Sequence, residues 1–117
     1  MKFIGRLAFG LTALVACAAN AADPKPIRFW NLTTSTVVDF RAAPTGTVDW
    51  GPNQCANDRD GDVDHDERLR ITGITPGRYD VKLTFKDGRA CTVRNIEIKD
   101  GAIFSIENKD LTDCHKP

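Results

Sequence analysis

The stretch RYDVKLTF, residues 78–85, decides the fold class of this chain. Hydrophobic residues occupy every second position from Tyr79 to Phe85, and polar residues fill the positions between them. Successive side chains of a β-strand point to opposite faces, so this alternation predicts a strand with one face buried and the other in solvent. One-sided strands of this kind are typical of antiparallel sheets.

The sequence that follows predicts more strands, separated by turns. Lys86-Asp87-Gly88 is a turn sequence, and residues 89–98 predict the next strand. The hydrophobic alternation slips near Arg94-Asn95, which indicates a β-bulge there. Lys99-Asp100-Gly101 predicts a second turn, after which residues 102–108 are expected to complete a three-stranded meander.

Before residue 78 the predicted strands are shorter. They cover residues 27–32, 36–41 and 68–74, and the second is expected to place Val38 and Phe40 on one face. No mature segment has the spacing of a useful amphipathic helix. The sequence therefore predicts an all-β fold over residues 27–117. We expect a small antiparallel β-sandwich, immunoglobulin-like or transthyretin-like, with about six to seven strands and no substantial helix.

The first residues have the features of a secretory signal peptide, which we assign to residues 1–21. Lys2 and Arg6 provide the positive start, a short apolar run follows, and Ala19-Asn20-Ala21 is a cleavage sequence. The run is too short for a membrane span. Residues 22–26 are then a flexible leader ahead of the folded domain.

A second interpretation of this segment stays open. Leu14-Val15-Ala16-Cys17 resembles a bacterial lipobox, in which Cys17 would be lipidated and become the first residue. Either product reaches an oxidising compartment of the cell envelope. We expect a periplasmic or secreted protein or, as the alternative, an outer-membrane lipoprotein anchored through Cys17.

Charge and length exclude several classes of protein. The chain of 117 residues carries 16 Lys+Arg and 16 Asp+Glu, and without residues 1–21 it keeps 14 basic residues against 16 acidic ones, a net charge of −2. Such a chain lacks the basic excess of general nucleic-acid binders and is too short for a large multi-domain enzyme. Residues 57–67 hold six acidic side chains and one basic, or −5, which leaves +3 for the rest.

The acidic stretch resembles a calcium-binding loop. With Gly61 at the position reserved for glycine, residues 56–67 place acidic side chains at ligand positions and Val63 at the apolar position. The candidate ligands are Asp58, Asp60, Asp62, Asp64 and Glu67. However, Ala56 occupies the first ligand position and no helices flank the loop. A solvated acidic loop at the sheet edge is therefore the first interpretation, and bound calcium the second.

Three cysteines remain beyond the signal peptide. A hairpin centred on Asp100-Gly101 would bring its far ends together, so we predict a disulfide between Cys91 and Cys114. Cys55 is then a free thiol, a partner for another chain, or a rival partner for Cys114. The sequence contains no C-x-x-C pair of the kind used in redox motifs or zinc knuckles.

Other chemical groupings have weak support. His65 and His115 lie in separate segments, so a copper or zinc site with Cys114 is a minor alternative. No serine has a catalytic motif around it, and no catalytic residues are predicted. Aromatic residues in strands are expected to pack in the core, but Trp50 precedes Gly51-Pro52 in a predicted loop and is a candidate binding surface.

The order of three short motifs resembles a family of short exported bacterial proteins of uncharacterised function. The motifs are Trp50-Gly51-Pro52-Asn53, then Gly77-Arg78-Tyr79-Asp80-Val81, then Asp87-Gly88. They correspond to a W-G-x-N element, a G-x-Y-D-[VIL] strand and a following D-G hairpin in that family. The resemblance implies an all-β domain and export to the envelope, and it implies no catalytic residues. The acidic stretch 57–67 is longer than the turn expected at that place.

These observations predict a non-enzymatic binding, interaction or structural module of the cell envelope, whose partner is an unidentified envelope protein or ligand. One alternative is a calcium-binding β-domain that uses the acidic loop. Another is a small metal- or thiol-dependent enzyme that uses Cys55 or the region of His65. We expect no nucleic-acid partner, and contact with a membrane only if Cys17 is lipidated.

Overall fold

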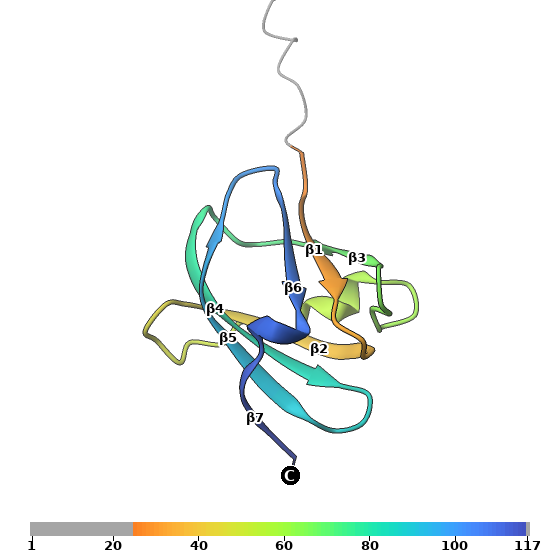
Figure 1. The fold of residues 1–117 in the computed structure, drawn as a ribbon. Coiled ribbons are helices and arrows are strands. Elements are labelled where there is room, and N and C mark those ends of the chain that lie inside the picture. Colours follow the sequence, from red (N-terminus) through yellow and green to blue (C-terminus); the bar gives the residue numbers. More distant parts are fainter. Residues whose placement is uncertain (1–24, 117) are drawn as a thin grey trace, which may run out of the picture.

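In a computed structural model that describes residues 25–116, seven strands form two β-sheets (Figure 1). The predicted signal peptide, including Cys17, lies outside the described residues. The strands are β1 (Ile27–Leu32), β2 (Val37–Pro44), β3 (Arg68–Ile71), β4 (Gly77–Phe85), β5 (Ala90–Ile98), β6 (Ile103–Glu107) and β7 (Thr112–His115). The helical elements in this range are two 3-10 turns, η2 (Gln54–Asn57) and η3 (Asn108–Asp110). The all-β prediction is confirmed.

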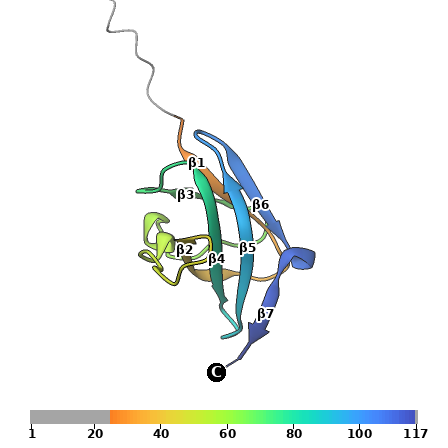
Figure 2. The ribbon, with the colours of Figure 1, turned by 90° about the vertical axis from the view of Figure 1, so that its left-hand side faces the viewer.

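The two sheets pack face to face in a sandwich-like arrangement. One has the order β3-β1-β6, and the other has the order β2-β4-β5-β7. Figure 2 looks onto the four-stranded sheet, with β1 and β3 behind it. All pairings are antiparallel except that of β1 with β6, which is parallel. Within residues 25–116, no helix is long and apolar enough to cross a membrane.

The stretch that predicted the fold is strand β4. Val81, Leu83 and Phe85 are buried, as the alternation predicts, and Tyr79 packs against the same core. The predicted bulge is also present, because the register of β4 against β5 shifts at the residues opposite Arg94-Asn95. Asn95 adopts a φ of 60°, a left-handed conformation that asparagine tolerates better than most residues.

The predicted three-stranded meander was wrong. After Lys99-Asp100-Gly101 the chain leaves the four-stranded sheet, and β6 pairs in parallel with β1 in the other sheet. This position lets Phe104 pack on Phe29, with ring centroids 5.8 Å apart. A turn sequence reverses the chain direction but does not determine which sheet edge the next strand meets. The place beside β5 is taken by β7.

Strand β2 also differs from the prediction. Val38 and Phe40 were expected to share a face, but Val37 and Phe40 are the fully buried pair and Val38 is half-buried. A register shift against β4 between Val37 and Asp39 accounts for the change, because one extra residue moves the following side chains to the opposite face. The largest fully buried side chains of the core are Phe29, Phe40, Phe85, Leu69, Leu83, Ile98 and Ile106.

Candidate functional site

The acidic loop, residues 57–67, is held to the sandwich through Val63. The Val63 side chain is buried, and its backbone forms a two-way bridge with Val37, with N···O distances of 3.0 and 2.8 Å. The side-chain amide of Asn31 also donates a 2.8 Å hydrogen bond to the Val63 carbonyl. The loop therefore has an ordered base from which the acidic side chains project.

Three of the five predicted calcium ligands lie together. Asp58, Asp60 and Asp62 can each place a carboxylate oxygen within 4.8 Å of the other two. Calcium–oxygen distances of about 2.3–2.6 Å allow two ligands of one ion to lie up to roughly 5 Å apart, so the spacing suits a shared cation. Among residues 25–116 it is the one group of three or more His, Cys, Asp or Glu side chains with this spacing.

The other two predicted ligands, Asp64 and Glu67, are not members of this group. Glu67 Oε1 accepts a 2.8 Å hydrogen bond from the backbone N–H of Asp64. Asp64 Oδ1 accepts a 2.7 Å hydrogen bond from the hydroxyl of Thr36. Both carboxylates thus stabilise the turn that leads into β3. Calcium binding itself stays a prediction.

The predicted disulfide between Cys91 and Cys114 is confirmed. It forms between neighbouring strands, because β7 pairs with β5 through Ala90 and His115 on one side and Thr92 and Thr112 on the other. The pair was predicted from a hairpin that does not exist, and the β5–β7 pairing brings the same two cysteines together. A disulfide indicates an oxidising compartment. It also removes Cys114 from any site with His65 and His115.

Cys55 is the free cysteine among the described residues, and its side chain is fully buried. Loss of hydration raises the pKa of its thiol to about 12, with further contributions from the negative charges of Asp39, Asp58 and Asp62. The reactive form of cysteine is the thiolate, which this environment disfavours. The geometry therefore opposes the thiol-enzyme alternative.

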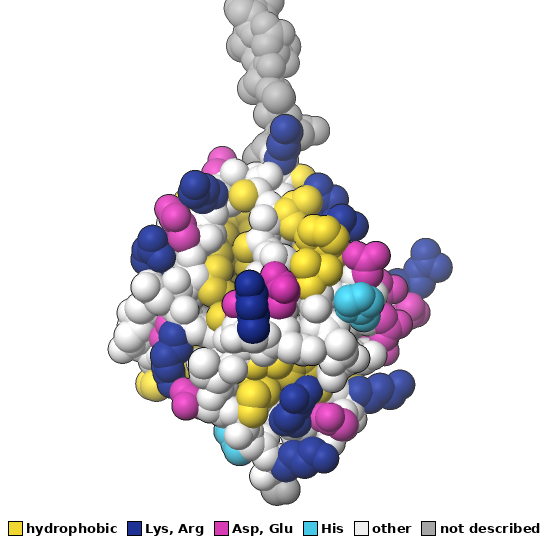
Figure 3. Space-filling view, viewed as in Figure 1, with side chains coloured by type: hydrophobic (Ala, Val, Ile, Leu, Met, Phe, Trp, Pro, Cys, Tyr) yellow, Lys and Arg dark blue, Asp and Glu magenta, His cyan; other side chains and the backbone are white. Residues whose placement is uncertain are grey.

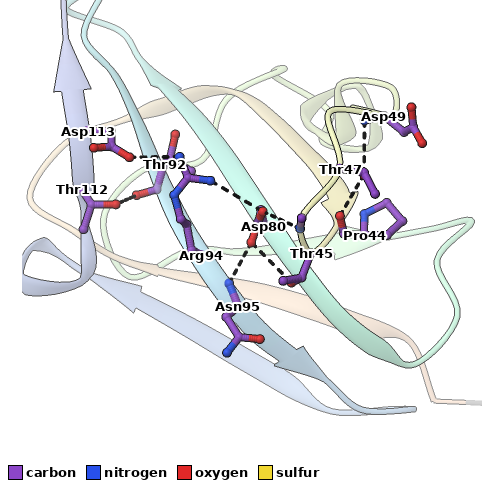
Figure 4. Close-up of polar contacts among 11 residues, drawn as sticks. Pro44, Thr45, Thr47, Asp49, Asp80, Thr92, Arg94, Asn95, Thr112 and Asp113 are labelled. Atoms are coloured by element: carbon purple, nitrogen blue, oxygen red, sulfur yellow. Dashed lines mark hydrogen bonds and ion pairs between the residues drawn. The ribbon is translucent and has the colours of Figure 1, made fainter.

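Asp80 of β4 was predicted to face solvent but is only 3% exposed. The reason is a set of donors that the turn after β2 and the β5 bulge direct at its carboxylate (Figure 4). The backbone N–H groups of Asn95 and Gly46 donate at 2.9 and 3.2 Å, the Thr45 hydroxyl donates at 3.3 Å, and Arg94 lies at 3.7 Å. Burial alone would raise the pKa of Asp80, but the hydrogen bonds and Arg94 hold it below its ordinary value.

The candidate residue Trp50 lies half-buried in the loop between β2 and η2, with Lys82 Nζ 4.8 Å from the centre of its ring. Two residues before it, Val48 is 81% exposed. Asn53 ties the loop down, because its Oδ1 accepts hydrogen bonds from the backbone N–H groups of Phe40 and Cys55. The Trp and Asn of the W-G-x-N element thus have different positions, one at the surface and one supporting the loop.

A pocket of about 300 Å³ lies beside this loop. The loop contributes Gly51 and Pro52 to it, and the connection between β3 and β4 forms the facing wall. Its lining residues are Ala42, Pro44, Gly51, Pro52, Gln54, Thr72, Gly73, Ile74, Thr75 and Tyr79. The pocket is mostly apolar and near the lower end of the size range of small-ligand sites.

A group of arginines around Trp30 was not predicted from the sequence. Trp30 was expected in the core, but Arg68 lies over its ring at 4.4 Å and Asp66 Oδ1 accepts a 2.9 Å hydrogen bond from its indole N–H. The alternating pairs Arg28-x-Trp30 and Arg68-x-Arg70 are visible in the sequence. Only the pairing of β1 with β3 shows that they share one face.

Comparisons of the chain with protein-family models, with curated proteins and with solved structures give no match.

Proposed function

We propose that this protein is a non-enzymatic binding module of the cell envelope, periplasmic or secreted, that belongs with the short exported bacterial proteins it resembles. The signal-peptide pattern of residues 1–21 and the disulfide between Cys91 and Cys114 support this location. A lipid anchor on Cys17 is the alternative form, and the intact mass of the protein from its native envelope distinguishes the two.

The observation that carries the proposal is the pocket of about 300 Å³ beside the Trp50 loop, a loop that also carries the exposed Val48. Pockets with a largely apolar lining and a few polar groups are typical of ligand and partner sites. We infer that the partner meets the end of the sandwich formed by the Trp50 loop and the connection between β3 and β4.

A photo-crosslinking residue at position 48 tests this proposal in intact cells. The matched control places the same residue at Lys86, an exposed position in the turn between β4 and β5. We expect a discrete adduct from position 48 that is absent from position 86. Thr75→Trp, which narrows the pocket while keeping the backbone carbonyl that binds Tyr79, is expected to weaken that adduct. Equal adducts from both positions, or none from position 48, would contradict the proposal.

A second candidate function is calcium binding, which the grouping of Asp58, Asp60 and Asp62 favours. A ligand that binds the folded state stabilises it by about 2.7 kcal/mol at one hundred times its Kd. We therefore expect a higher Tm in millimolar calcium than in chelator, and a smaller difference in Asp60→Asn. The control is Asp49→Asn, which neutralises an exposed acid outside the acidic loop. No shift in the wild type would exclude this candidate.

A further inference from the structure

The outer face of the three-stranded sheet carries a row of basic side chains. Ile27, Phe29, Leu69 and Ile71 point into the core, so the residues that alternate with them on β1 and β3 point outward. These outward residues are Arg28, Trp30, Arg68 and Arg70. In the strand register Arg28 lies opposite Arg70, and Trp30 lies opposite Arg68. We call these four residues the basic face.

The neighbouring strand extends this face with a hydrophobic residue. Ile103 of β6 lies opposite Arg28 in the register and is 43% exposed, and Ser105 lies opposite Trp30. Figure 3 shows basic side chains along the border of a hydrophobic patch over this part of the molecule. The surface thus combines guanidinium groups with an aromatic and an aliphatic side chain.

The arginines of the basic face have no acidic partners among residues 25–116. No Asp or Glu side-chain oxygen in this range lies within 4.0 Å of a side-chain nitrogen of Arg28, Arg68 or Arg70. The nearest identified acid contact on this face is that of Asp66, which binds the indole of Trp30. Like charges directly opposite each other on paired strands destabilise a sheet, and Arg28 and Arg70 form such a pair. An anion bound between them would remove this repulsion.

The row of arginines leads into a pocket. Arg70 and Lys25 both line a shallow pocket of about 320 Å³, together with Asp100 and several apolar residues. Its apolar lining comes from Pro26, Ile27, Ile71 and Ile74. This pocket is large enough for one sugar unit, and it places two cations beside apolar atoms. The basic face therefore continues, at Arg70, into a recess.

We propose that the basic face binds an anionic polysaccharide whose sugars carry carboxylates. Arg68 and Arg70 lie on the same side of β3, about 6.8 Å apart, so one chain ligand with several carboxylates can reach both guanidinium groups. Guanidinium groups bind carboxylates through paired hydrogen bonds. Ile103 contacts the apolar face of a sugar ring, Arg68 binds its carboxylate while it lies over the Trp30 ring, and one sugar occupies the pocket of Lys25 and Arg70.

The charge distribution favours such a polymer over a nucleic acid. Without residues 1–21 the chain has a net charge of −2 and lacks the basic excess that is typical of nucleic-acid binders. The inference rests on the proposed function as an envelope binding module and names the class of its partner. The arginines lie on β1 and β3, outside the pocket beside the Trp50 loop, but the recess at Lys25 and Arg70 shares Thr72, Gly73 and Ile74 with that pocket.

The test measures binding of the purified protein to oligogalacturonate by calorimetry, with fully methyl-esterified oligogalacturonate as the uncharged comparison. We expect binding of the charged oligomer alone. The double variant Arg28→Gln/Arg70→Gln should bind at least tenfold more weakly. The control is Lys86→Gln/Lys109→Gln, which removes the same charge from exposed positions outside the basic face and should bind like the wild type.

Tryptophan fluorescence gives a second readout that a merely structural change would not reproduce. The spectral change on binding should disappear in Trp30→Phe and persist in Trp50→Phe. Both arginine substitutions lie at exposed positions and remove a repulsive pair, so the Tm of the double variant should not fall.

Several results would overturn the inference. One is equal binding of the esterified oligomer, and another is an equal loss of affinity in the control double variant, which would show unspecific attraction. Preferred binding of single-stranded DNA would point to a nucleic acid instead. Absence of binding to oligogalacturonate together with a specific adduct from position 48 would refute the inference while leaving the proposed function in place.

Discussion

Replacement of Asp80 by alanine is expected to destabilise the fold strongly. The carboxylate is the shared acceptor for two separate parts of the chain, namely Thr45 and Gly46 after β2 and the bulged residue Asn95 of β5. In Asp80→Ala the N–H groups of Gly46 and Asn95 lose their acceptor, and both lie in a partly buried region. The perturbation therefore affects the loop after β2 and the bulge together.

The expected loss of unfolding free energy follows from these contacts. A hydrogen bond to a charged group contributes about 1.5–3 kcal/mol, and two backbone donors depend on Asp80. The pair with Arg94 adds little, because Arg94 is 60% exposed and surface ion pairs contribute about 0–1 kcal/mol. We expect Asp80→Ala to lower the free energy of unfolding by about 3–4 kcal/mol. For a domain of this size the Tm should fall by roughly 15–25 °C.

The pH dependence of the stability tests the contribution of the Asp80 charge separately. The folded-state pKa of Asp80 is lowered, so its contribution is complete above the unfolded pKa of about 4 and is lost as pH falls through the lower folded value. Asp80→Asn keeps the size of the side chain but does not titrate. The stability difference between wild type and Asp80→Asn should therefore be largest above about pH 4 and should shrink below it.

Urea unfolding followed by tryptophan fluorescence measures these differences. The control is Asp113→Asn, which removes the exposed partner of Arg94 at 3.0 Å and should cost less than about 1 kcal/mol. The reasoning would be refuted if Asp80→Ala stayed within about 1 kcal/mol of the wild type, below the value of a single charged hydrogen bond. It would also fail if the difference between wild type and Asp80→Asn did not change with pH.

Three further predictions concern the cysteines and one glycine. Cys91→Ser should lower the free energy of unfolding by about 3 kcal/mol, since the disulfide closes a loop with a sequence separation of 23; equal urea midpoints with and without reductant would contradict this. The Cys55 thiol, with a pKa raised to about 12, should resist alkylation at pH 8 until urea unfolds the protein, and rapid labelling of the folded state would refute its burial. Gly101→Ala should lower the Tm more than Gly46→Ala: both have positive φ, but only the added Cβ at position 101 meets Lys25 Cβ, at 3.0 Å. Equal Tm changes in the two variants would show that the contact with Lys25 is unimportant.

The fold was predictable where the deciding physics is local. The alternation of residues 79–85 reports the two faces of a strand, and the slip at Arg94-Asn95 reports a bulge, because both follow from the geometry of one strand. The partner of β6 was not predictable in this way. Its pairing with β1 depends on which aromatic side chains meet, here Phe29 and Phe104, and not on the turn before it.

In the candidate site, too, the local features were predictable from the sequence and the long-range contacts were not. Asp58, Asp60 and Asp62 alternate within five residues, so their proximity is a local property of the loop. Asp64 was expected to join them, but its carboxylate accepts a hydrogen bond from Thr36, which is 28 residues away in the sequence. The sequence of the loop contains no information about a hydrogen-bond donor 28 residues away. Whether Asp64 joins the other candidate ligands depends on the position of Thr36 beside the loop in the folded chain.

The sequence by itself determined the all-β class, the strands from β1 to β6 and the bulge, because short-range stereochemistry leaves few alternatives. Strand β7 was not predicted, and its pairing with β5, not the predicted hairpin, brings Cys91 to Cys114. The tertiary structure alone decided that Asp80 is buried, that Cys55 is enclosed, and that Arg28, Trp30, Arg68 and Arg70 form one face. Each of these depends on groups far apart in the chain that pack or pair only once the two sheets are assembled.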